Sequence, residues 1–190
     1  MAAPPAPPLL LASTSPRRRE ILEQLRIPFD VVAPEYEETQ DDPVAHALGK
    51  ARSVLAEADG RPVVACDTEV LLGDRVYGKP SGPEEAEEML ESLSGRTHEV
   101  VSGLALLTPA WEEVRHEVTR VTFRGLTARD IGRYVASEEW EGRAGAYAIQ
   151  GQGAALIERI EGDYLNVVGL PAALLVRILA ERFAGAYGLG

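Results

Sequence analysis

The sequence predicts an α/β protein, and three observations support that prediction. Short apolar stretches alternate with segments whose apolar residues recur at helical spacing. Several of these segments carry proline where a helix would begin, a position at which its missing N–H costs nothing. Two long β-prone segments, 97–108 and 111–124, are joined only by Pro109-Ala110 and predict a hairpin. With 190 residues, the chain is expected to form one domain or two closely joined lobes.

In the first half of the chain, apolar strands and amphipathic helices follow one another. Ser15 is predicted to cap the first helix, with Pro16 at the first helical position, and Asp42 caps the second. Gly73-Asp74 supplies the turn of a small hairpin. Helices are predicted over 16–26, 43–58 and 83–93, and strands over 9–12, 29–33, 61–66 (ending at Asp67-Thr68), 69–72 and 75–77.

In the second half, Thr127 and Asp130 form a variant of the capping box at the start of a helix. Residues 143–153 are poor in side-chain bulk, which lets the backbone approach another backbone or a flat ligand closely. The other predicted elements are helices over 127–137 and 171–183 and a strand over 154–160, which 164–168 extends or pairs with. We expect a tail over 1–8, a single domain over 9–185 and a frayed end over 186–190.

The composition of the sequence argues against several classes of binding partner and cellular location. A formal net charge of -11 argues against binding nucleic acid or an anionic membrane. Cys66, the only cysteine, excludes an intramolecular disulfide, and its apolar surroundings indicate a buried structural thiol. The first residues lack the features of a signal peptide, and no stretch reaches the ~18 apolar residues of a membrane span. We therefore expect a cytoplasmic protein.

The turn between the first strand and the first helix is a candidate phosphate site. The free N–H groups and the positive end of the helix dipole face the segment from Ser13 to Ser15. Arg17 and Arg18 stand on the first helical turn, where a cation is locally unfavourable unless an anion offsets it. The alternative interpretation is an ordinary Ser-Pro cap on a solvated helix.

Three further residues are candidates for chemistry. Asp67 follows an apolar strand, and active groups of open α/β sheets gather beyond the carboxyl ends of strands, although Asp67 equally suits a turn cap. Lys79, between Gly78 and Pro80, suits a single phosphate contact. Gln150 offers a donor and an acceptor that would read the edge of a base, or else it fills a loop.

Six short blocks of the sequence, in order along the chain, resemble the signature blocks of the Maf family of nucleoside triphosphate pyrophosphatases. Any single block is weak, but six in the family's order are specific, and they spread over nearly all of the chain from Leu9 to about Phe183. The blocks are Leu11-Ala12-Ser13-Thr14-Ser15-Pro16-Arg17-Arg18, Asp67-Thr68, Gly78-Lys79-Pro80, Leu93-Ser94-Gly95-Arg96-Thr97-His98, Ala144-Gly145-Ala146-Tyr147-Ala148-Ile149-Gln150-Gly151 and Asn166-Val167-Val168-Gly169-Leu170-Pro171.

The resemblance implies an α/β fold like that of the inosine-triphosphate pyrophosphatases, with a two-lobed mixed β-sheet, flanking helices and an active-site cleft between the lobes. It also implies a homodimer and a reaction in which a nucleoside triphosphate and water give the monophosphate and pyrophosphate. The reaction would require a divalent metal, Mg²⁺ or Mn²⁺, which prefers carboxylate oxygens as ligands.

The resemblance also implies roles for individual residues. Asp67 matches the acid that acts as general base, either on water directly or through a metal that it holds. Glu38, or its neighbour Glu37, matches a second acid on the metal side. The positions that match triphosphate contacts are Ser13, Arg17, Arg18 and Lys79.

Substrate choice follows from the same resemblance. Arg17, Thr68 and Gln150 match specificity positions, and arginine at 17 is similar to the branch that acts on dTTP and UTP. Glu69 stands where many relatives carry an aliphatic residue, so it adds a metal ligand if it points into the cleft and is inert if it points away. Two alternatives stay open: a pyrophosphatase for 7-methyl-GTP or another purine triphosphate, and a non-catalytic nucleotide-binding regulator of septum formation.

Overall fold

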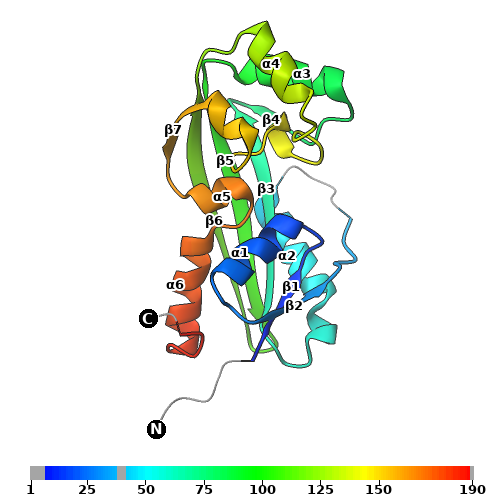
Figure 1. Ribbon diagram of the computed structural model, residues 1–190. Helices are drawn as coiled ribbons and strands as arrows, with labels where there is room; N and C mark the ends of the chain where they lie inside the picture. The colour runs from blue at the N-terminus through cyan, green and yellow to red at the C-terminus, as the bar shows by residue number, and fades with distance from the viewer. Residues whose placement is uncertain (1–6, 38–41, 189–190) are drawn as a thin grey trace. The chain divides into compact units, whose positions relative to one another are not determined.

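The computed structural model describes residues 7–37 and 42–188, and it is an α/β structure (Figure 1). Its strands form a mixed sheet in the order β2-β1-β3-β5-β6-β7, with β4 paired to β3. The chain divides into two compact units. Unit 1 contains the described residues of 7–67, 102–117 and 169–188, and unit 2 contains 68–101 and 118–168. The predicted α/β class is confirmed, and β3, β5 and β6 each continue from one unit into the other.

In unit 1, three parallel strands alternate with helices. β1 (Leu9–Ala12) pairs with β2 (Phe29–Val32) on one side and with β3 (Val63–Leu72) on the other. Between them run α1 (Pro16–Gln24), α2 (Pro43–Ser53) and a short 3-10 helix (Leu55–Ala58). Helical crossovers make these strands parallel, as expected for β-α-β connections.

Small side chains bring α2 against the sheet. Ala47 and Ala51 of α2 pack on Leu10 of β1 and Ala65 of β3 in one buried cluster. Gly103, on the part of β5 in unit 1, permits a still closer approach, because a Cβ there would lie 2.1 Å from the carbonyl oxygen of Pro43. The start of α2 is thereby held close to the strands, which positions the polar side chains of this helix.

The two predicted helix caps of unit 1 differ in the structure. Asp42 caps α2 as predicted, since its Oδ1 accepts from the backbone N–H groups of Val44 and Ala45 at 2.9 and 3.1 Å. Ser15 occupies the N-cap position of α1, but its side chain makes no capping hydrogen bond. Instead, the Ser15 N–H donates to Ser13 Oγ at 3.2 Å. The hydroxyl that organises this turn therefore belongs to Ser13.

The prediction that the third strand ends at Asp67 is wrong. β3 continues through Asp67 to Leu72 and then turns at Gly73, whose φ of 61° suits glycine, into β4 (Arg75–Tyr77). The hairpin itself is confirmed. A carboxylate is tolerated in the middle of the strand because basic side chains from α2 contact it.

In unit 2, helices α3 (Pro83–Leu93) and α4 (Ala128–Val135) agree with the prediction. Thr127 and Asp130 form the expected capping box, and the Arg124 guanidinium also bonds Asp130. The long hairpin is confirmed as β5 (Thr97–Thr108) and β6 (Trp111–Phe123), and β6 pairs antiparallel with β7 (Ile157–Glu161).

Two predictions for the segment from residue 154 to residue 168 are wrong. Residues 152–156 form a 3-10 helix (Gln152–Leu156), so β7 begins only at Ile157. Tyr164–Val168 is a short helix, α5, and not a strand. Asp163 Oδ1 accepts from the Leu165 N–H at 2.8 Å and starts this turn, while the buried Asn166 amide donates to Val100 O and Thr119 Oγ1. The apolar residues of this segment therefore belong to a short helix that carries a buried amide.

The last predicted helix is confirmed as α6 (Ala172–Phe183), in unit 1. Most of the predicted tail over 1–8 and the last two residues of the predicted frayed end lie outside the described residues. Within the described ranges, no helix combines the length and the hydrophobicity that crossing a membrane requires.

Candidate active site

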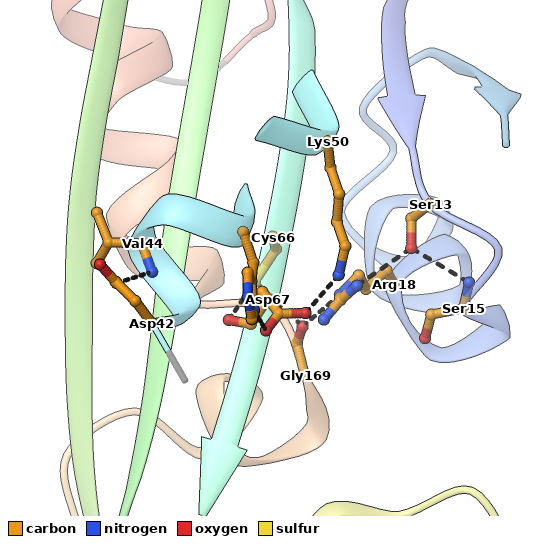
Figure 2. Close-up of polar contacts among 10 residues, drawn as sticks. Ser13, Ser15, Arg18, Asp42, Val44, Lys50, Cys66, Asp67 and Gly169 are labelled. Atoms are coloured by element: carbon orange, nitrogen blue, oxygen red, sulfur yellow. Dashed lines mark hydrogen bonds and ion pairs between the residues drawn. The ribbon is translucent and has the colours of Figure 1, made fainter. Parts of the chain in front are cut away.

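Asp67 lies on β3, and its side chain contacts Lys50 of α2 (Figure 2) and also His46 of the same helix. The Lys50 ammonium donates to Asp67 Oδ1 at 2.5 Å, and His46 Nδ1 lies 3.2 Å from Asp67 Oδ2. His46 and Lys50 are four residues apart, which puts them on one face of the helix. Strand alternation places Asp67 on the same face of β3 as Val63 and Ala65, which pack against α2.

The cluster around Asp67 is largely shielded from water. The side chains of Asp67 and Lys50 are 14% and 11% exposed, and that of His46 is 5% exposed. Charges in such surroundings interact more strongly than on the surface, because solvent screens them less. The Lys50 ammonium therefore partly neutralises a carboxylate that would otherwise repel an anionic ligand.

The predicted phosphate turn comes together in unit 1 as well. Arg18 Nη1 donates to Ser13 Oγ at 3.2 Å, and Arg18 Nε donates to the Gly169 carbonyl at 2.9 Å. The same carbonyl lies 3.5 Å from the Cys66 thiol, next to Asp67 on β3 (Figure 2). Gly169 thus joins the arginine turn to the strand that carries Asp67.

Because of these contacts, the arginine at position 18 does not by itself indicate a bound anion at this turn. Arg18 finds acceptors within the protein, so its position alone does not require a bound anion. Arg17 is half-buried on the same first turn of α1. The first N–H groups of the helix still lack intrahelical partners, as at every helix start, and favour a negative group there. Phosphate binding by Ser13, Arg17 and Arg18 stays a prediction.

Lys79 lies in unit 2 on an exposed loop whose position is fixed by the neighbouring backbone. The carbonyl of Gly78 accepts from the Gly145 N–H at 3.1 Å. Gly145 has a φ of 69°, and a Cβ there would lie 3.0 Å from a Val70 methyl carbon. The low bulk of residues 143–153 therefore serves close backbone packing, as the sequence predicts.

The loop that carries Gln150 is held on both sides of that residue. Before it, the Ala148 N–H donates to the Tyr134 hydroxyl at 2.9 Å; after it, the Glu139 carboxylate accepts from the N–H groups of Gln152 and Gly153 at 2.7 and 3.4 Å. Burial raises the pKa of Tyr134 to about 12, so the hydroxyl stays protonated at neutral pH. Gln150 itself is exposed, as a ligand-reading side chain would need to be.

The other predicted site residues divide between the two units and the undescribed segment. Thr68 is half-buried on β3 in unit 2. Glu38 lies outside the described residues, and its neighbour Glu37 is exposed. Glu69 lies two residues after Asp67 on the same face of β3. Asp67 and Glu69 offer the carboxylate oxygens that Mg²⁺ or Mn²⁺ prefers, so the residues present fit a divalent metal.

The two partners of Asp67 and the residue that holds the Gln150 loop are not among the residues predicted from the sequence. His46 and Lys50 gave a signal, since two basic residues four apart on a helix share one face. Glu139 gave no signal beyond its place in a polar connector, because only the folded chain brings its carboxylate to the backbone of 152 and 153.

Curated relatives and one family model match almost the whole chain. A dTTP/UTP pyrophosphatase of Gloeobacter violaceus is 46% identical over 180 residues, which cover 91% of this chain and 95% of that relative. A protein of the same name from Deinococcus radiodurans is 44% identical over 195 residues and covers 100% of both chains. Among solved structures, the Staphylococcus aureus Ham1 protein matches with a TM-score of 0.47 at 17% identity, over 62% of this chain and 72% of that one. The family model described as Maf-like protein matches residues 8–182, and this chain belongs to that family.

Proposed function

We propose that this protein hydrolyses dTTP and UTP to the nucleoside monophosphate and pyrophosphate. Relatives of 44% and 46% identity over nearly the whole chain are dTTP/UTP pyrophosphatases. The observation that carries the proposal is the shielded carboxylate of Asp67, bonded by Lys50 and joined through Gly169 to the Ser13–Arg18 turn. Recognition of a triphosphate needs no such acid, which would repel it, whereas hydrolysis needs a group that activates water.

Asp67 activates the attacking water, either by accepting its proton directly or through the metal that it holds. Its Oδ1 is held by Lys50, so the carboxylate has a fixed orientation, and the lysine charge reduces its repulsion of the substrate. A divalent metal, Mg²⁺ or Mn²⁺, would be held by Asp67 and Glu69 and by the predicted acid Glu38, and when bound it lowers the pKa of coordinated water and neutralises phosphate charge.

The triphosphate is bound by Ser13, Arg17, Arg18 and Lys79. The bonds from Arg18 to Ser13 Oγ and the Gly169 carbonyl fix the plane of its guanidinium, which orients the group toward phosphate oxygens. Arg17, Thr68 and Gln150 select the base. The backbone hydrogen bonds on both sides of Gln150 support this role, since they fix the part of the loop from which its side chain extends.

We further propose a homodimer in the cytoplasm, as the family resemblance suggests. Analytical ultracentrifugation of the full chain across a concentration series is expected to give a mass of twice 20.5 kDa. A monomer at all concentrations would exclude the dimer.

The experiment that tests the function measures pyrophosphate release from dTTP, UTP, CTP, GTP, ITP and 7-methyl-GTP with Mg²⁺ or Mn²⁺. Release is expected from dTTP and UTP, and Asp67→Asn is expected to lower it by about 10³-fold because the group that activates water is lost. Asp74→Asn, in the exposed β3-β4 turn, is the matched control and should keep full activity.

The other outcomes separate the alternatives. Release mainly from a purine triphosphate would assign the protein to another substrate branch. Nucleotide binding without release from any substrate would favour a non-catalytic regulator. Full activity of Asp67→Asn would remove Asp67 from the mechanism.

A further inference from the structure

We propose that His46 is a nitrogen ligand of the divalent cation held at Asp67, so that this site binds Mn²⁺ or Co²⁺ in preference to Mg²⁺. This inference rests on the proposed function, which puts the cation at Asp67. It adds a residue of α2 to the oxygen ligands of β3 and a preference among metals that follows from that residue.

The geometry at Asp67 places two ligand atoms side by side. His46 Nδ1 lies 3.2 Å from Asp67 Oδ2. Two ligands of one octahedral cation, each at ~2.1 Å, are separated by about 3 Å. Lys50 bonds the other carboxylate oxygen, Oδ1, and so orients Oδ2 toward the imidazole. Asp67 Oδ2 and His46 Nδ1 therefore have the separation that a shared cation requires.

Hydrogen bonding accounts for only one of the two ring nitrogens of the buried His46, since Nδ1 faces Asp67 Oδ2. The residue is 4% exposed, and its Nε2 is buried with no hydrogen-bond partner among the residues that the structure describes. A buried polar atom without a partner destabilises the fold, and an apolar residue on this face of α2 would avoid that penalty. A role for the other ring nitrogen, Nδ1, explains why an imidazole stands here despite that penalty.

The ring is also held in place from the side. Tyr36 packs edge-on against His46, with ring centroids 6.0 Å apart. Gly49, three residues along α2, makes room for the Tyr36 ring, because a Cβ there would lie 2.1 Å from Tyr36 Cε2. A metal ligand benefits from such a fixed orientation, since less conformational freedom is lost on binding.

The donor set determines the preferred metal. Carboxylate oxygens from Asp67 and Glu69 suit both Mg²⁺ and Mn²⁺, whereas an imidazole nitrogen binds divalent transition metals such as Mn²⁺ and Co²⁺ better than it binds Mg²⁺. Mg²⁺ rarely takes nitrogen ligands and keeps its waters, so it gains little from His46. The histidine thus raises the affinity for Mn²⁺ and Co²⁺ more than that for Mg²⁺.

The test is electron spin-echo spectroscopy of Mn²⁺ bound to the full chain without nucleotide. Coordination by imidazole is expected to give a ¹⁴N coupling that changes to ¹⁵N when the protein is labelled with ¹⁵N-histidine. This comparison needs no substitution and is independent of any effect on folding. His46→Leu should abolish the coupling and weaken Mn²⁺ binding by about tenfold, with less than threefold change for Mg²⁺. His116→Gln, an exposed histidine on β6, is the matched control.

Bound Mn²⁺ without histidine coupling overturns the proposal, because His46 would then only hydrogen-bond Asp67. Absence of Mn²⁺ binding overturns it too. Pyrophosphate release from dTTP, measured on the same preparation, separates this inference from the proposed function. Pyrophosphate release without a histidine coupling supports the proposed function and excludes His46 as a metal ligand. A histidine coupling without pyrophosphate release supports His46 as a ligand and contradicts the proposed function.

Discussion

Two buried histidines of this protein have opposite surroundings. His46 and His98 are 4% and 1% exposed, and each has one ring nitrogen without a hydrogen-bond partner within the described residues. His46 faces a carboxylate that is paired with Lys50. His98 lies 2.8 Å from the Tyr147 hydroxyl and packs edge-on against the rings of Phe123 and Tyr147.

The difference shows that burial alone does not mark a functional histidine. Burial lowers the pKa of His98 to about 4, so this ring is neutral at physiological pH and acts as part of an aromatic cluster. At His46, the neighbouring groups are charged and carry the proposed chemistry. The group that faces the ring nitrogen, and not the exposed fraction, distinguishes the two residues.

Among the variants that test the surroundings of Asp67, of His98 and of the Gln150 loop, removal of the charged partner of Asp67 has the largest expected effect. Lys50→Met should lower pyrophosphate release by about 10²-fold or more, because the carboxylate loses its orientation and repels the substrate. It should also reduce the free energy of unfolding, since a shielded carboxylate is left without its cation. Urea unfolding and the release assay measure the two effects.

The double variant Lys50→Met with Asp67→Asn separates stability from function. Removing both charges should restore most of the lost stability but none of the activity. If Lys50→Met keeps full activity, the lysine is only a structural partner of Asp67.

The second-largest expected effect is on the pH dependence of the free energy of unfolding, to which His98 contributes. The unfolded histidine titrates near 6.5 and the folded one near 4, so between these values only the unfolded chain binds the proton. The stability from this residue is therefore complete above pH 6.5 and is lost as the pH falls to about 4, by about 3 kcal/mol in all.

Urea unfolding of the wild type and of His98→Leu between pH 7 and pH 4 measures this contribution. The leucine variant should lose about 3 kcal/mol less over this range, while its activity per folded molecule at pH 7 stays near that of the wild type. His116→Gln serves as the control. Equal pH dependence in the leucine variant and the wild type would contradict the role given to His98.

The smallest expected effect tests the loop next to the His98 cluster. Glu139→Gln should weaken the hold on the N–H groups of Gln152 and Gly153, because a neutral acceptor forms weaker hydrogen bonds than a carboxylate. A several-fold rise in KM for dTTP is expected with a change of less than about 1 kcal/mol in stability. Glu141→Gln, an exposed acid of the same connector, is the control. An unchanged KM would show that Glu139 does not position the Gln150 loop for substrate.

The sequence by itself determined most of the elements, because their signals are local. Pro16, Pro43 and Pro83 begin helices as expected, and the capping box of Thr127 and the long hairpin appear where predicted. The motif blocks were also enough to indicate the family, since each block is a short contiguous segment.

Only the tertiary structure decided what surrounds Asp67 and where polar residues are buried. β3 runs through Asp67, whose carboxylate finds Lys50 and His46 on α2, and Tyr164–Val168 is a helix that carries the buried Asn166 amide. The free energy of a buried polar group depends on partners distant in sequence, and local pattern carries no information about them. For the same reason, His46 and His98 cannot be distinguished in the sequence, and the contacts of their ring nitrogens separate them in the fold.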